Sequence, residues 1–309
     1  MDGPDLELYR RSSLIARGYT DRELRGLRRR GRFTLPRRGA YLVGPRLAEA
    51  EAWHRANVHA ALSQLGDDVV ISHLSAAVLH GLPTWGVSLD TVNVTRSRRS
   101  GGRKQRLVHV RTARLEPADV VMLDGVLVTS AARTVVDIAR CTSFAAAVVV
   151  ADAALARCMV TSAELLHVLS RCRRWPGSPH AQRVIAFADG RAESVGESRS
   201  RVAIALAGLP RPEPQWVVHD AGGRFVARTD FGWEQQRVVG EFDGLTKYGR
   251  LARPGQAPGD VVFAEKRRED EVRAEGITVV RWTWADLHPF ESTAARLRRA
   301  LTDSTAHSE

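Results

Sequence analysis

Three carboxylates in the last third of the chain have residue types and spacing suited to binding a divalent cation. Glu241 lies inside an apolar stretch, where an acid is costly unless a cation or a base compensates it. Asp243 lies two residues further on and so shares its face of a strand. Asp230 lies near the end of the preceding predicted strand, and antiparallel neighbours about 4.8 Å apart would bring it opposite Glu241. Mg²⁺ relieves the repulsion among such carboxylates, and its bound water can attack a phosphodiester.

The elements that would position these acids follow the order helix, three strands, helix, strand. The turn Asp220-Ala221-Gly222-Gly223 joins the first two strands and favours an antiparallel pair. We predict strands over 216–219, 224–233, 238–243 and 278–282, and helices over 193–207, 262–275 and 292–301. This αβββαβ order brings the acids to neighbouring strands of one sheet.

The acidic motif and this element order resemble the PD-(D/E)XK nuclease superfamily. Asp230 is followed by ten residues and then by Glu241 in a hydrophobic strand. The segments T-D-F-G-W, V-V-G-E-F-D-G and V-V-R-W-T-W are more specifically similar to endonuclease-like domains related to very-short-patch repair (Vsr) nucleases. The resemblance implies a restriction-endonuclease-like domain over 191–309 that hydrolyses DNA phosphodiesters with Mg²⁺-activated water.

The resemblance also implies roles for individual residues. Asp230 and Glu241 match the metal-binding acids, and Glu197, in G-E-S-R-S-R, matches the acid of the first helix. The match departs where the superfamily has a lysine, because this chain has Asp243 there, and the resemblance to Vsr-like sites implies Asp243 as a third metal ligand. Two of the three lysines of the chain lie nearby and are candidates for the missing positive group, Lys266 before Lys247.

The first 48 residues predict a helix-turn-helix followed by a β-hairpin. A first helix over 6–15 would end before Gly18. A second helix would begin at Thr20, which with Glu23 forms a capping box, and would end near Gly31. Two strands, 33–35 and 40–43, would follow. This is the order of a winged helix-turn-helix domain over 1–48.

The charge of this segment favours double-stranded DNA as its partner. Residues 10–38 contain eleven arginines and two acids, which gives +9 of a whole-chain net charge of +11. One broad face of the second helix carries four arginines suited to the major groove: Arg22, Arg25, Arg28 and Arg29. Arg37 and Arg38 occupy the predicted tip of the wing. The alternative is a solvated basic helix in a small helical domain.

The basic first segment resembles the winged-helix domain of AbiEi-type antitoxins from type IV toxin–antitoxin systems, and the resemblance extends into the middle segment. The combination with a Vsr-like domain resembles a group of actinobacterial proteins. It implies a transcriptional repressor that binds operator DNA and a cognate toxin. The chain is therefore interpreted as a metal-dependent DNA endonuclease or, alternatively, as a non-enzymatic antitoxin or repressor with an inactive nuclease fold.

The middle segment, 49–190, predicts a mixed α/β connector without recognisable chemistry. Its arginine-rich loop over 96–106 would be a flexible hairpin tip, either lying along phosphates or merely solvated. Four histidines on predicted helices are interpreted as packing or capping residues because no carboxylate is spaced to complete a metal site: His54, His59, His73 and His80.

Composition limits the class and the location of the protein. The chain is an α+β multidomain chain of 309 residues with 44% hydrophobic and 26% charged residues. No stretch of eighteen apolar residues predicts a membrane span, and the acidic, then basic start does not read as a signal peptide. Three widely spaced cysteines favour a reduced cytoplasm. Mg²⁺ is the expected cofactor, and no organic cofactor is expected.

Overall fold

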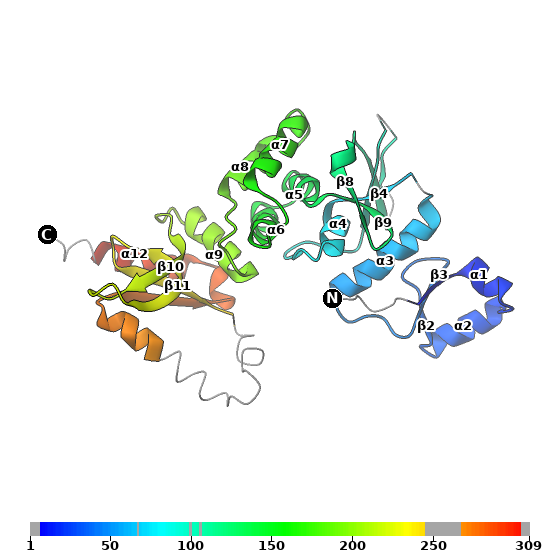
Figure 1. Ribbon diagram of the computed structural model, residues 1–309. Coiled ribbons are helices and arrows are strands. Elements are labelled where there is room, and N and C mark those ends of the chain that lie inside the picture. Colours follow the sequence, from blue (N-terminus) through cyan, green and yellow to red (C-terminus); the bar gives the residue numbers. More distant parts are fainter. Residues whose placement is uncertain (1–6, 67, 99–100, 105–106, 245–266, 304–309) are drawn as a thin grey trace. The chain divides into compact units, whose positions relative to one another are not determined.

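The protein is described here by a computed structural model covering residues 7–66, 68–98, 101–104, 107–244 and 267–303 (Figure 1). The chain divides into two compact units, Met1–Phe187 and Ala188–Glu309. The predicted first and middle segments thus fall into one unit, and the second unit begins three residues before the predicted 191. Both units mix helices with sheets, which confirms the α+β class.

The N-terminal part of the first unit is a pair of short helices against a three-stranded antiparallel sheet of order β1-β3-β2. Leu14, Leu24 and Tyr41 form its small core. The predicted first helix is corrected, because residues 8–10 pair with β3 as a strand and the helix begins only at Arg11. The elements are β1 (Leu8–Arg10), α1 (Arg11–Ala16), α2 (Asp21–Arg29), β2 (Phe33–Thr34) and β3 (Ala40–Val43).

A six-stranded mixed sheet of order β6-β7-β5-β4-β9-β8 forms the rest of the first unit together with its helices. The pairs β5–β7 and β4–β9 are parallel, and the other pairs are antiparallel. The strands are β4 (Val70–Ile71), β5 (Val92–Arg96), β6 (Arg103–Lys104), β7 (Val108–Thr112), β8 (Val120–Leu123) and β9 (Val126–Thr129). The predicted hairpin between the strands that flank 96–106 is wrong, because β5 and β7 run parallel. The antiparallel partner of β7 is the short strand β6.

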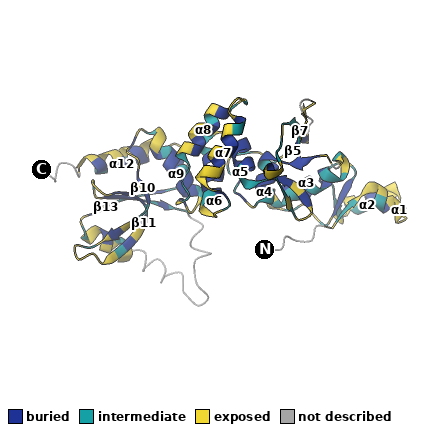
Figure 2. Cartoon of the chain, turned by 45° about the horizontal axis from the view of Figure 1, so that its top comes forward, coloured by how far each residue is buried: buried dark blue, intermediate teal, exposed yellow. Residues whose placement is uncertain are grey.

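Six helices accompany this sheet. The core beneath α3 and α4 is built from small and branched residues such as Val58, Ile71 and Val94. Figure 2 shows buried residues along these strands and on α5 and α6. The helices are α3 (Ala50–Leu65), α4 (His73–Leu79), α5 (Ala131–Ala139), α6 (Phe144–Ala156), α7 (Ser162–Cys172) and α8 (Ser178–Phe187), with a short 3₁₀ turn, η1 (Pro117–Asp119).

The second unit is a four-stranded sheet of order β10-β11-β12-β13 with helices on both faces. The first two pairs are antiparallel, and β12 and β13 are parallel. Its elements are α9 (Val195–Leu206), β10 (Glu213–His219), β11 (Phe225–Trp233), β12 (Val238–Asp243), a helix over 267–274, β13 (Thr278–Thr283), η2 (Ala285–Leu287) and α12 (Glu291–Asp303). The predicted order of elements is therefore present, with β10 beginning three residues earlier than expected.

Two apolar cores hold this sheet in place. Phe231 stacks on Trp282, with ring centroids 5.5 Å apart, in the core shared with α9 and α12. On the other face Val239 packs with Val272 of the helix over 267–274. The helix α9 approaches β12 so closely that a Cβ on Gly196 would lie 1.9 Å from the Phe242 ring. This contact fixes the start of α9, and with it Glu197, over the sheet.

Among the helices that the structure describes, none combines the length and the apolar character needed to cross a membrane.

Candidate nucleic-acid interface and acidic site

The start of helix α2 is fixed by the predicted capping box. The Thr20 hydroxyl accepts a hydrogen bond from the Glu23 backbone N–H at 3.3 Å, and the Glu23 carboxylate accepts one from the Thr20 N–H at 2.8 Å. The Thr20 N–H and the Thr20 hydroxyl, which also donates to the Glu23 carboxylate at 2.8 Å, lower the pKa of Glu23, since both hydrogen bonds favour its ionised form. The box orients a helix that carries only one buried side chain, Leu24, so nearly all of its surface is available to a partner.

The predicted arginine face is present on α2. Its four arginines are exposed and line one shallow concave surface: Arg22, Arg25, Arg28 and Arg29. Within the described part of the chain, none of the four lies within ion-pair distance of a carboxylate. Arg25 donates to the backbone carbonyl of Asp21 at 3.2 Å, whereas Asp21 itself pairs with Arg11. The face thus keeps four positive charges for a polyanion.

The two arginines in the turn between β2 and β3 differ in their exposure to solvent. Arg38 is exposed, and its backbone carbonyl accepts a hydrogen bond from the Gln64 side chain at 2.8 Å, which anchors the turn to α3. Arg37 is half-buried, one of its terminal nitrogens is buried without a hydrogen-bond partner, and burial lowers the pKa of its guanidinium. Arg38 is therefore the residue of this pair that is presented to a partner.

In the second unit the structure brings together two of the predicted acids, Asp230 and Glu197. The β11–β12 ladder ends at Phe231 opposite Gly240, and one Asp230 carboxylate oxygen accepts the Phe242 backbone N–H at 2.8 Å. Burial and the charge of Asp230 raise the pKa of Glu197. The two carboxylates therefore lie within electrostatic range of each other.

Glu197 is held rigidly. Its carboxylate accepts hydrogen bonds from the Glu193 N–H at 2.9 Å, the Ser194 hydroxyl at 2.7 Å and the Gln215 amide at 2.9 Å, and only 7% of the residue is exposed. Gln215 reaches it from a backbone position with φ of +56°, within β10. An acid so enclosed is expensive to ionise, in keeping with its raised pKa.

The other predicted acids lie further along β12. Glu241 is opposite Arg281 in the parallel β12–β13 register, and it lines a small hollow with Arg268 and Glu269. Arg281 lies 3.0 Å from the Glu269 carboxylate, so this hollow contains charges of both signs. Asp243 is opposite Thr283. Two further predicted candidates, Lys247 and Lys266, lie outside the described residues.

The described residues do not assemble the expected metal triad. Among them, no group of three or more histidine, cysteine, aspartate or glutamate side chains is arranged to hold a metal ion. The predicted metal ligands Asp230, Glu241 and Asp243 thus do not form a three-ligand site, and Glu197 with Asp230 is the acidic pair that can be described. One Asp230 oxygen accepts a hydrogen bond from the backbone of β12, and the regular β11–β12 ladder ends at the Phe231–Gly240 pair.

The histidines of the middle segment contact protein groups. The two ring nitrogens of His54 lie 2.6 Å from the Leu89 carbonyl and 2.8 Å from the Ser75 hydroxyl, and His80 lies 2.7 Å from the Thr129 carbonyl. Burial lowers the pKa of both rings.

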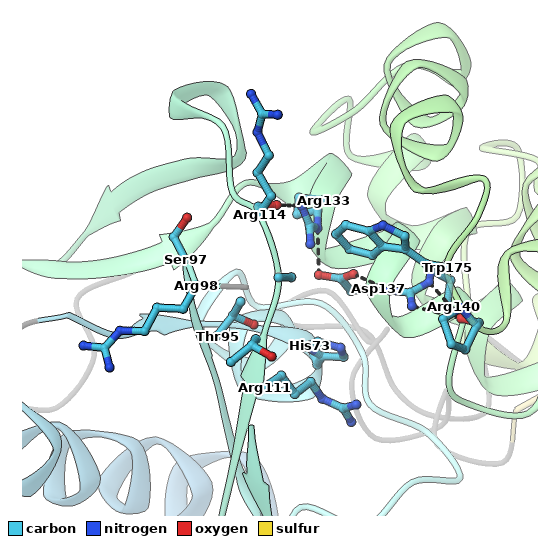
Figure 3. Close-up of a pocket in the computed structure, with 13 residues that line it drawn as sticks. His73, Thr95, Ser97, Arg98, Arg111, Arg114, Arg133, Asp137, Arg140 and Trp175 are labelled. Atoms are coloured by element: carbon cyan, nitrogen blue, oxygen red, sulfur yellow. Dashed lines mark hydrogen bonds and ion pairs between the residues drawn. The ribbon is translucent and has the colours of Figure 1, made fainter. Parts of the chain in front are cut away.

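A further polar site in the first unit was missed at the level of sequence. A cavity of about 770 Å³ is lined by five arginines from separate segments of the middle of the chain (Figure 3): Arg98, Arg111, Arg114, Arg133 and Arg140. They are 42 positions apart at most and obey no common period, so only the fold brings them together. The signals in the sequence were the excess of arginine and the arginine-rich loop over 96–106, which contains Arg98.

The comparisons with known proteins do not extend to a family of established function. No family model matches the chain. Two Mycobacterium tuberculosis proteins, the uncharacterised MT2308 of strain CDC 1551 / Oshkosh and the uncharacterised Rv2248 of strain H37Rv, are each 32% identical to it over 177 residues. This match covers 53% of the chain and 63% of each relative, less than two thirds of their length. Among solved structures, the crystal structure of the RV2827C protein from M. tuberculosis is similar at a TM-score of 0.39 and 17% identity, over 69% of this chain and 83% of that one.

Proposed function

We propose that the protein binds double-stranded DNA through its first 48 residues, in the manner of a winged helix-turn-helix domain, and acts as a repressor or antitoxin at operator DNA. The observation that carries this proposal is the set of four exposed arginines on one face of α2, which have no carboxylate partner among the described residues. Charges left unpaired on a capped helix favour a polyanionic partner.

The geometry of α2 suits a major groove. An α-helix with its side chains is about 10–12 Å in diameter and a B-DNA major groove is about 12 Å wide, so the helix can enter with its arginines directed at base edges and phosphates. Arginine binds guanine O6 and N7, or a phosphate, with two parallel hydrogen bonds. Arg38, exposed in the turn between β2 and β3, is placed to contact the DNA backbone beside the groove.

The test is DNA binding by the full chain, followed by fluorescence anisotropy with a labelled duplex. Replacing the four arginines of α2 by alanine is expected to abolish binding at physiological salt, because most of the phosphate neutralisation on this face is lost. Unchanged affinity in the fourfold variant would reject the proposal. A cognate toxin belongs to the same proposal, and co-purification with the product of a neighbouring gene would test it.

A second candidate function is metal-dependent DNA cleavage by the second unit. Its support is the αβββαβ order together with the enclosed pair Glu197 and Asp230, whose mutual repulsion a divalent cation would relieve. The described residues fit such a cation with two carboxylates only, so no catalytic step is derived from it.

Plasmid nicking in Mg²⁺, with EDTA and Asp230→Asn as controls, tests this second function. Cleavage that requires Mg²⁺ and is lost in Asp230→Asn would establish it, and equal cleavage by the variant would reject this pair as its site.

A further inference from the structure

The arginine-lined cavity of the first unit lies at the carboxyl ends of two parallel strands. Thr95 comes from the end of β5, Arg111 and Thr112 come from the end of β7, and Arg133 and Arg140 of α5 form the opposite wall (Figure 3). Crevices at this edge of parallel strands are a common position for ligands in α/β proteins. The cavity therefore lies where α/β proteins commonly bind ligands.

One wall of the cavity is held rigid by an ion-pair cluster on α5. Asp137 accepts hydrogen bonds from Arg133 at 2.8 Å and from Arg140 at 3.1 Å. Both guanidiniums also lie 4.9 Å from the centre of the Trp175 ring. Arg133 is 2% exposed and Asp137 is 1% exposed, so these charges have left water. The wall is thus preorganised and needs little rearrangement to meet a ligand.

The charges around the cavity do not balance. Arg111 has no carboxylate within ion-pair distance among the described residues, and its buried Nε lacks a hydrogen-bond partner. Three cations, Arg111, Arg133 and Arg140, therefore face the single carboxylate of Asp137, an excess of two positive charges. A neighbouring cluster behind Arg133 reduces this excess to one, since it contains Asp119, Glu116 and Arg171. An excess of positive charge on a half-buried surface favours an anionic ligand.

The floor of the cavity is polar but uncharged. His73 is 5% exposed, and burial, together with three neighbouring arginines, lowers its pKa to about 3, so the imidazole is neutral at pH 7. Its Nδ1 lies 3.0 Å from the Ser72 hydroxyl, which in turn accepts a hydrogen bond from Thr95 at 2.8 Å. His73 also has a φ of +52°, in the left-handed region that costs a non-glycine residue energy. Such strain concentrates at ligand sites.

We propose that this cavity binds the phosphoryl group of a small phosphorylated molecule of nucleotide size. A phosphate monoester carries about −1.5 to −2 charges at pH 7, so it supplies the negative charge that the positive excess attracts, and guanidiniums bind its oxygens with paired hydrogen bonds. The volume of about 770 Å³ falls within the usual range for small-molecule sites, whereas a duplex needs an open groove. In Figure 3 the Arg98 and Arg114 side chains point away from Arg133, Asp137 and Arg140. Arg111 lines the cavity and has a buried Nε without a hydrogen-bond partner, so it is the arginine that we assign to the ligand.

Isothermal titration calorimetry of the full chain with AMP, adenosine and inorganic phosphate tests this proposal. AMP is expected to bind, adenosine is not, and inorganic phosphate is expected to bind more weakly than AMP. Arg111→Ala is expected to weaken AMP binding about tenfold to a hundredfold, the effect of losing one or more hydrogen bonds to a charged group. Arg111→Lys keeps the charge but loses the planar fork, so its affinity is expected to be intermediate.

The matched control is Arg174→Ala, which removes an exposed arginine close to the cavity that does not line it. It is expected to change AMP affinity less than about twofold. Circular dichroism checks that each variant is folded, and Arg111→Lys keeps the test valid if the alanine variant does not fold.

Four results would overturn the proposal: no binding of AMP, equal binding of adenosine, inorganic phosphate binding as tightly as AMP, or an equal loss in Arg174→Ala. Displacement of AMP by duplex DNA would also overturn it, because the cavity would then belong to the DNA interface.

Discussion

The salt dependence of DNA binding offers a quantitative test of the arginine face on α2. We choose the double variant Arg28→Ala/Arg29→Ala because both side chains are exposed and lie in the last turn of the helix. Each phosphate contact contributes about 0.9 to the slope of log K against log salt, so loss of two contacts lowers the slope by about 1.8. Between 50 and 200 mM salt, the fold-decrease in the binding constant should then be about twelve times larger for the parent than for the variant.

The assay is fluorescence anisotropy with one duplex at four or more salt concentrations. The matched control is Arg173→Ala/Arg174→Ala, which removes two adjacent exposed arginines at the end of α7 and should leave the slope unchanged. Removing positive charge from a helix C-terminus slightly weakens the helix, so circular dichroism of both variants is required. A slope in Arg28→Ala/Arg29→Ala equal to that of the parent would refute the assignment of α2 as the DNA-binding element.

Three further predictions concern the interiors of the two units. Arg133→Met leaves the buried Asp119 and Asp137 with one arginine each, Arg171 and Arg140, and should cost about 3 kcal/mol in urea unfolding, the lower end for removing one partner of a buried ion pair. Asp230→Asn should lower the pKa of Glu197 in carboxyl-carbon NMR. Because folding raises the pKa of Glu197, the free energy of unfolding falls as pH rises from the unfolded to the folded pKa of this carboxyl. Asp230→Asn should make this fall smaller. An unchanged pKa of Glu197 in the variant would show that the two acids do not interact. Gly196→Ala should lower the free energy of unfolding by about 1–3 kcal/mol, because the new Cβ would overpack against Phe242. Gly26→Ala, whose Cβ would have ordinary contacts, should stabilise α2 by about 1 kcal/mol. Melting temperatures that shift in the same direction for both variants would contradict this.

Local signals predicted the elements well where a few adjacent residues decide the structure. Thr20 and Glu23 cap α2 as expected, because both partners of the capping box lie within one helical turn. The short strands β4 and β6 were not predicted, since two residues carry no periodic pattern and each exists only through pairing with distant segments. The same is true of β1, where Leu8 was assigned to a helix but pairs with Leu42 across the sheet.

The acidic site was predictable in its residues but not in its geometry. Alternation along a regular ladder placed Asp230 opposite Glu241, but the ladder ends one pair earlier and Asp230 instead caps the backbone of β12. The proximity of Asp230 to Glu197 depends on the close packing of α9 on β12 through Gly196, a tertiary contact that no spacing rule contains. The cavity beside His73 was beyond sequence reasoning for the same reason.

Both proposed sites bind phosphate through arginine, but their arginines differ in burial. Each proposal can therefore be tested, and rejected, independently of the other. The arginines of α2 are exposed and unpaired, so their attraction to phosphates is long-range, additive in charge number and screened by salt. Arg111 is half-buried and lines a cavity whose wall is fixed by the buried Arg133–Asp137 pair, so its contribution depends on paired hydrogen bonds and is screened less by salt. Arg111→Ala should therefore weaken AMP binding and leave the DNA salt slope intact, and Arg28→Ala/Arg29→Ala should do the reverse. A single variant that weakened both equally would mean that one diffuse basic surface, and not two sites, accounts for the binding of phosphates.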